Sequence, residues 1–156
     1  MKIAIRPNYT YFNEEKFRFC VEHILNTNYK SWAKSEEAPN NTDCITAIRW
    51  ILGQSSDFLL PRGYIWDFPK ILESNSQKIP ISDIRVGDLV FFERMSFTHN
   101  KYMISHIGIM VSESHFFHSS LHFWWGKISS LADFDYKNSI LDESFLSIAR
   151  DPRLYD

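Results

Sequence analysis

The sequence predicts an α+β domain in which helices come first and an antiparallel sheet of about five strands follows. Apolar residues recur at helical spacing up to about residue 53. From Val86 onward, short segments rich in β-branched and aromatic residues alternate with polar turns. Helices followed by strands in one chain are typical of α+β domains. The length of 156 residues fits a single domain, residues 1–156, with enough chain for a core.

The first helix is expected from about residue 13 to residue 26. Asn13 is a good capping residue, and the two glutamates after it suit the positive end of the helix dipole. An apolar stripe follows at helical spacing, made of Phe17, Val21, Ile24 and Leu25. Cys20 lies near this stripe, and we interpret it as a small buried thiol that fills the core. Residues 1–11 are expected to form an irregular arm or a short strand.

A second helix is predicted to begin at Cys44. Residues 39–43 are turn and cap formers, and Asp43 is expected to cap the helix. Four apolar residues share one helical face with the cysteine: Ala47, Ile48, Ile51 and Leu52. Gly53 marks the expected end of the helix. Cys44 is therefore predicted at a helix N-terminus, where unpaired N–H groups stabilise a thiolate.

The rest of the chain is assigned from its turn residues and composition. Asp67 and Pro69 predict the start of a third, shorter helix, and residues 73–80 are expected to form a surface linker. Strands are predicted at residues 86–93, 102–112, 115–120, 126–131 and 144–149.

Composition and charge argue against several classes of protein. The net charge is −2 and no basic run exceeds two residues, which argues against a nucleic-acid surface. The two cysteines form no CxxC pair and do not make a disulfide scaffold. No apolar run reaches the length of a membrane span, and residues 1–7 hold no stretch long enough for a signal peptide. We therefore expect a cytoplasmic protein, or one exported without a leader, unless a leader has been removed.

Two histidines lie twelve positions apart on predicted neighbouring antiparallel strands. His106 shares a strand face with Gly108, which predicts open space beside the imidazole, whereas Ile107 and Ile109 form a core face. On the next strand, His118 can accept the Nδ1–H of His106 and fix its tautomer. Together with the Cys44 thiol, the pair predicts a nucleophile, a base and an orienting group, as in a cysteine hydrolase or acyltransferase. The other candidate histidines, His99, His115 and His122, rank below these two.

Four short segments carry a resemblance to a known family. They are Asp43-Cys44, Val86-Gly87-Asp88-Leu89-Val90-Phe91-Phe92, Ser105-His106-Ile107-Gly108-Ile109 and Phe116-Phe117-His118-Ser119-Ser120. In this order, over roughly residues 30–131, the chain resembles the NlpC/p60 family of papain-like cysteine peptidases. The resemblance implies a papain-like fold with Cys44 as nucleophile, His106 as general base, His118 as orienting residue, and no cofactor. It also implies a peptide or muropeptide substrate, cut at the γ-D-glutamyl bond to a diamino acid in peptidoglycan stem peptides.

The chain departs from the family pattern close to the expected nucleophile. The family usually continues Asp-Cys-Ser-Gly, whereas Ile45 and Thr46 follow here. The family often has a tyrosine about twelve residues before the cysteine, and this chain has Trp32 there, with Tyr29 nearby. The substrate contacts are therefore expected from three residues, Trp32, Asp43 and Tyr29.

Three other interpretations stay open on the sequence. An amidase, deamidase or acyltransferase of the same fold could act on protein or lipid substrates, as an effector or toxin does. The three residues Cys44, His106 and His118 are also competent zinc ligands, although the sequence offers no fourth ligand at a typical spacing. A binding module with an idle triad could use the aromatic residues, 16% of the chain, as its recognition surface; an aromatic core explains the same content.

Overall fold

The computed structural model of the protein describes residues 2–96, 98–120 and 124–134. Its strands are β1 (Lys2–Pro7), β2 (Asn28–Tyr29), β3 (Asn41–Thr42), β4 (Ser76–Ile79), β5 (Leu89–Ser96), β6 (Lys101–Met110), β7 (His115–Ser120) and β8 (Trp125–Ser130). Its helices are α1 (Glu14–Ile24), α2 (Cys44–Ser55) and α3 (Phe68–Ile71). Short 3-10 turns are η1 (Ser35–Glu37), η2 (Ile65–Asp67), η3 (Ile81–Asp83) and η4 (Leu131–Phe134).

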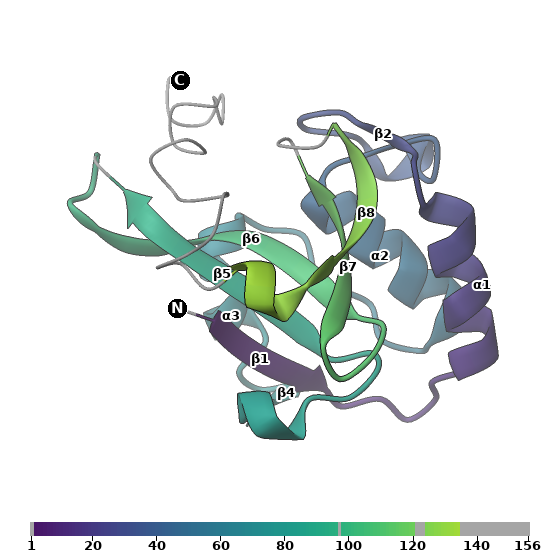
Figure 1. Ribbon diagram of the computed structural model, residues 1–156, viewed down its shortest axis with the longest axis horizontal. Helices are drawn as coiled ribbons and strands as arrows, with labels where there is room; N and C mark the ends of the chain where they lie inside the picture. Colours follow the sequence, from purple (N-terminus) through teal and green to yellow (C-terminus); the bar gives the residue numbers. More distant parts are fainter. Residues whose placement is uncertain (1, 97, 121–123, 135–156) are drawn as a thin grey trace.

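The eight strands form one sheet in the order β3-β2-β8-β7-β6-β5-β1-β4. Neighbouring strands are antiparallel, except that β2 and β3 pair in parallel. The long β5–β6 hairpin extends to one side, while β7 and β8 turn away from it toward α2 (Figure 1). The predicted α+β class is confirmed, but the expected count of about five strands is too low. The predicted strand at residues 144–149 lies outside the described residues.

β1 forms within residues 1–11, where an irregular arm or a short strand was expected, and the strands that the sequence did not predict, β2, β3 and β4, lie at the two edges of the sheet. β1 pairs with β5 and with β4, so residues 76–79 are part of the sheet and the predicted linker at residues 73–80 is wrong there. β4 is mostly polar and exposed, because an edge strand is held by backbone hydrogen bonds and needs no apolar face. Composition therefore gave no sign of it.

Helices α1 and α2 begin as their capping residues predict. The Asn13 side chain accepts a hydrogen bond from the Lys16 N–H at 2.8 Å, and Asp43 accepts one from the Thr46 N–H at 2.7 Å. α2 continues past Gly53 and ends at Ser55, because an exposed glycine inside a helix weakens it without breaking it. Pro69 lies in the first turn of α3, as expected.

Apolar side chains cover both faces of the sheet. On one face, α1 and α2 pack against the sheet in the main core, which includes Cys44, Ile48, Leu52, Ile107, Ile109 and Phe117. The opposite face carries a smaller second core, made of Ala4, Ile84, Val90, Phe92, Met110, Phe116 and Leu131. α2 contacts β6 and β7, and α1 lies outside α2 (Figure 1). The start of α2 is thereby held next to the two strands that carry the histidines.

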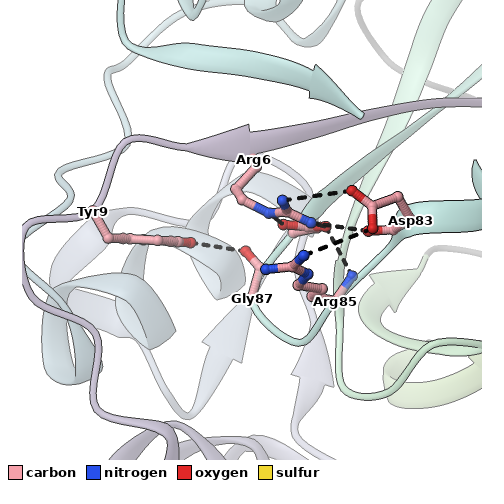
Figure 2. Close-up of polar contacts among 6 residues, drawn as sticks. Arg6, Tyr9, Asp83, Arg85 and Gly87 are labelled. Atoms are coloured by element: carbon pink, nitrogen blue, oxygen red, sulfur yellow. Dashed lines mark hydrogen bonds and ion pairs between the residues drawn. The ribbon is translucent and has the colours of Figure 1, made fainter. Parts of the chain in front are cut away.

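A buried polar network anchors the end of β6. Asp88, 1% exposed, accepts hydrogen bonds from Arg6 Nε at 2.8 Å and from the Arg85 N–H at 2.9 Å. Figure 2 shows Arg6 of β1 next to Asp83 and Arg85, with Tyr9 directed at the Gly87 carbonyl. The turn before β5 is also hydrogen-bonded to the end of β6, because the Met110 N–H donates to the Asp88 carbonyl at 2.8 Å. These hydrogen bonds therefore fix the positions of β1 and of this turn relative to the end of β6.

Within the described residues, no helix has both the length and the apolar character that crossing a bilayer requires.

Candidate functional site

Cys44 occupies the first position of α2 and is 8% exposed. Asp43 before it is in extended conformation and caps the helix through Thr46. The thiol therefore lies at the positive end of the helix dipole, where an anion is stabilised. The same sequence signals that start the helix also place the sulfur at its N-terminus.

The structure brings His106 and His118 into direct contact. His106 Nε2 lies 2.7 Å from His118 Nδ1, and the two rings meet edge to face at 4.9 Å between centroids. The expected contact through Nδ1 of His106 is therefore wrong: Nε2 faces His118, which leaves Nδ1 for another partner. His118 is fully buried, whereas His106 is partly exposed.

The histidines lie where β6 and β7 separate. These strands pair through Ile109–Phe117 and Met110–Phe116, near the end of β6. Beyond these pairs the strands diverge (Figure 1), and the two imidazoles bridge the opening. β6 also has a bulge in its pairing with β5. Phe92 pairs with His106 and Glu93 pairs with Ile104, so Ser105, directly before His106, has no partner in the β5–β6 register. Such bulges re-aim the neighbouring side chain.

The space predicted beside Gly108 is filled. A Cβ atom added at this glycine would clash with the Phe116 ring, which lies directly over it. The glycine therefore permits close approach of an aromatic ring, and the prediction of open space is wrong. The Phe116 ring also contacts His118, at 4.7 Å between centroids, and Phe92 contacts His106 at 6.0 Å. The aromatic rings pack around the imidazole pair and hold it in place.

Burial changes the ionisation of the first histidine. It lowers the pKa of His106 to about 4, and the positive charge of Arg94 on β5 acts in the same direction. Both effects disfavour the imidazolium. His106 is therefore neutral at pH 7.

Two hydrogen bonds connect the strand before Cys44 to the strand of His118. The Ser119 hydroxyl donates to the Thr42 carbonyl at 3.1 Å, and the Thr42 hydroxyl donates to Ser119 Oγ at 3.0 Å. Thr42 and Ser119 are both fully buried. Thr42 lies two residues before Cys44, and Ser119 follows His118 directly. The segment before the helix start and the strand that carries His118 are thereby joined.

The residues expected to contact substrate lie around the start of α2. Trp32 is 50% exposed and has a positive φ of 60°, and the Ala33 carbonyl after it accepts a hydrogen bond from the Thr46 hydroxyl at 3.0 Å. Tyr29 is partly buried in β2, next to Thr42. Asp43 is occupied by helix capping. Trp32 is thus the exposed member of the three.

Sequence reasoning missed three serine and threonine side chains around the histidines: Thr42, Ser119 and Ser129. The Oγ atom of Ser129, on β8, lies 2.8 Å from His118 Nε2. Ser119 directly follows His118 in the sequence, so its position near the histidine pair could have been expected. The other two come from distant strands and could be found only from the pairing of β7 with β8 and from the position of β3.

The lower-ranked histidines lie apart from this site where they are described. His115 is exposed and contacts the Ser114 hydroxyl, and His99 contacts the Ser96 hydroxyl in the β5–β6 turn. His122 lies outside the described residues. In the described part of the chain, no three His, Cys, Asp or Glu side chains are grouped so as to hold a metal ion.

Comparisons with known proteins concern the family and the fold. The NlpC/P60 family model matches residues 27–136. The fold is similar to NlpC1 from Trichomonas vaginalis, with a TM-score of 0.59 and 19% identity, over 78% of this chain and 40% of that one. It is also similar to the NlpC/p60 domain of the peptidoglycan hydrolase SagA, with a TM-score of 0.57 and 20% identity, over 78% of this chain and 92% of that domain.

A third similar structure is a protein of the NLP/P60 family from Staphylococcus aureus, with a TM-score of 0.59 and 17% identity, over 87% of this chain and 41% of that one. The chain therefore spans about two fifths of the Trichomonas and Staphylococcus chains. No curated protein sequence matches it. The family model covers well over half of the 156 residues. The chain belongs to the NlpC/P60 family.

Proposed function

We propose that the protein is a cysteine peptidase that cleaves an amide bond through a thioester on Cys44. The observation that carries this proposal is the contact of His106 Nε2 with His118 Nδ1 at 2.7 Å, next to the helix start that holds the thiol. A base whose second nitrogen is held by an orienting group is the arrangement that activates nucleophiles in acyl transfer. The roles are Cys44 as nucleophile, His106 as base and His118 as orienting residue.

The low pKa of His106 defines the resting state. A neutral imidazole with Nε2–H directed at His118 has its lone pair on Nδ1, and in this proposal that lone pair accepts the thiol proton. Nδ1 takes the thiol proton as the sulfur attacks the amide carbonyl. The Cys44 N–H, at the N-terminus of α2, is a suitable donor to the oxyanion.

The tetrahedral intermediate collapses with cleavage of the C–N bond, and protonated Nδ1 gives its proton to the leaving amine. A thioester between Cys44 and the acyl part of the substrate remains. The same imidazole then removes a proton from water, which attacks the thioester and releases a carboxylic acid and the free thiol. Each step needs only the residues named and water.

The proposed substrate is a peptidoglycan stem peptide, cut at the γ-D-glutamyl bond to a diamino acid. Its support is family membership and the likeness to SagA, which is described as a peptidoglycan hydrolase. The residues at positions 45 and 32, Ile45 and Trp32, differ in type from those of the usual family pattern. An amidase, deamidase or acyltransferase activity on protein or lipid substrates is therefore the second candidate.

A substrate panel separates the two candidates. Purified protein is incubated with defined muropeptides, with a glutamine-containing protein and with a lipid amide, and the products are identified by mass spectrometry. We expect cleavage of muropeptides between the glutamyl residue and the diamino acid. Deamidation or acyl transfer with intact muropeptides would contradict the peptidase assignment. A Cys44→Ala variant is the control for hydrolysis by a contaminant.

A further inference from the structure

The histidine pair has a fourth member on the neighbouring strand. His118 Nε2 lies 2.8 Å from the Ser129 hydroxyl, on the opposite side of the ring from its contact with His106. His118 is 0% exposed and Ser129 is 7% exposed, so both groups are shielded from water. Ser129 lies opposite Phe116 in the β7–β8 pairing, two residues from the position opposite His118.

We propose that Ser129 is a positioning residue that sets the tautomer of both histidines. For His106 to act as base through Nδ1, its proton must reside on Nε2, and His118 Nδ1 must accept that proton in a hydrogen bond. His118 must then carry its own proton on Nε2, where Ser129 Oγ accepts it. The direction of every hydrogen bond in the chain is therefore determined by whether Ser129 accepts from His118.

The opposite direction would disable the base. If Nε2 of His118 were unprotonated, its proton would reside on Nδ1 and be donated to His106 Nε2. His106 would then carry its proton on Nδ1 and could not remove one from a thiol. A buried donor without a partner costs about 1–3 kcal/mol, which is enough to reverse a tautomer preference. An acceptor for Nε2–H of His118 is thus needed, and Ser129 fills that place.

The charges around the pair favour a hydroxyl acceptor over a carboxylate. Lys127 of β8 lies directly opposite His118, and Arg94 of β5 acts on His106. Phe92 contacts the His106 ring, and Phe116 contacts the His118 ring. The positive charge of Arg94 disfavours a second proton on His106, whereas a carboxylate at position 129 would attract one to the pair. A neutral acceptor adds no charge that would favour the imidazolium form of His106.

The test measures the tautomers directly and needs no substrate. Histidine labelled with 15N on both ring nitrogens is introduced, and the shifts of His106 and His118 are assigned by NMR. We expect Nε2–H and unprotonated Nδ1 in both rings of the wild type. In Ser129→Ala, a large fraction of His118 is expected to move its proton to Nδ1. Ser129→Thr keeps a hydroxyl and should resemble the wild type, as should Ser130→Ala, a neighbouring strand residue.

Hydrolysis kinetics give the second readout, and here the inference rests on the proposed function. Ser129→Ala should lower kcat about tenfold with little change in KM, and Ser129→Thr should recover most of it. A His118 proton on Nδ1 in the wild type, or tautomers unchanged in Ser129→Ala, would overturn the role of Ser129. A wild type without amidohydrolase activity would overturn the proposed function instead, because the tautomer measurement stands by itself.

Discussion

The Ser119 hydroxyl donates to the Thr42 carbonyl at 3.1 Å and joins the segment that leads into Cys44 to the strand that holds His118. The contact is fully buried and is doubled by the Thr42 hydroxyl, which donates to Ser119 Oγ at 3.0 Å. This connection joins the segment before the nucleophile to the strand of His118, so the relative position of the two depends on it.

Removal of this connection should affect the reaction more than the fold. Ser119→Ala leaves the Thr42 carbonyl with its second hydrogen bond, from the Lys30 N–H, but removes the acceptor of the buried Thr42 hydroxyl, and should cost about 1–3 kcal/mol of unfolding free energy. We expect kcat to fall several-fold more than this loss of stability alone explains, since small displacements of a nucleophile are costly. The double variant with Thr42→Val should show non-additive effects, measured by urea unfolding and steady-state kinetics. Additive effects would mean that the two side chains act separately.

The pH dependence of hydrolysis should reflect the low pKa of His106. Because the pKa is near 4, the imidazole stays neutral well below pH 6.5 and loses its basic form only as the pH falls through about 4. The acid limb of kcat/KM is therefore expected between pH 4 and 5. An acid limb at pH 6.5 or above would show that His106 is not the base, or that its environment differs in solution.

The same pKa predicts how stability changes with pH. Between pH 6.5 and 4, His106 is neutral in the folded protein, whereas in the unfolded chain it binds a proton. The unfolded state then binds more protons, so stability falls as the pH is lowered, by on the order of 2 kcal/mol. Urea unfolding at several pH values measures this for the wild type and His106→Gln. The variant should lose this part of the dependence, and His115→Gln, a change at an exposed histidine, should keep it.

Trp32 should contribute to substrate binding, although its backbone conformation is strained. A bulky residue with φ of 60° is uncommon, and such strain is typical of functional positions. Trp32→Gly should leave the melting temperature unchanged or raise it, and should raise KM several-fold with a smaller effect on kcat. Phe19→Ala removes an even more exposed aromatic ring from α1 and should leave KM unchanged. If Trp32→Gly leaves KM unchanged, the indole does not contact substrate.

Chelators should not affect the reaction. His118 Nδ1 contacts His106 and Nε2 contacts Ser129, so neither nitrogen is available as a metal ligand while these hydrogen bonds are made. Activity should therefore persist after EDTA treatment and dialysis, with metal content measured by mass spectrometry. Stoichiometric zinc whose removal abolishes activity would show that the zinc interpretation is right.

The parts of the site that the sequence predicted are those governed by local rules. Asp43 followed by an apolar helical stripe placed Cys44 at a helix start, and strand alternation with a short turn brought His106 and His118 together. The choice of ring nitrogen could not be predicted, because it depends on the bulge at Ser105 and on neighbouring rings. The same alternation predicted open space at Gly108, and packing from the next strand filled it with Phe116.

The parts that escaped prediction depend on pairing between distant segments. β4 is too polar to be recognised alone, and it exists because β1 offers a partner. Ser129 is an ordinary strand serine until the β7–β8 register sets it beside His118. The contact of Thr42 with Ser119 spans 77 positions of the chain. Such relationships follow from the assembled sheet, which no short window of sequence contains.

The most direct test of the central claim compares single substitutions at the two buried cysteines. Cys44→Ala and Cys20→Ala each remove one buried thiol, at the start of α2 and within α1. Both variants are assayed for muropeptide cleavage after circular dichroism has shown that they are folded. We predict that Cys44→Ala lowers kcat/KM at least about a thousandfold, whereas Cys20→Ala stays within a few-fold of the wild type. Undiminished cleavage by folded Cys44→Ala would contradict the account.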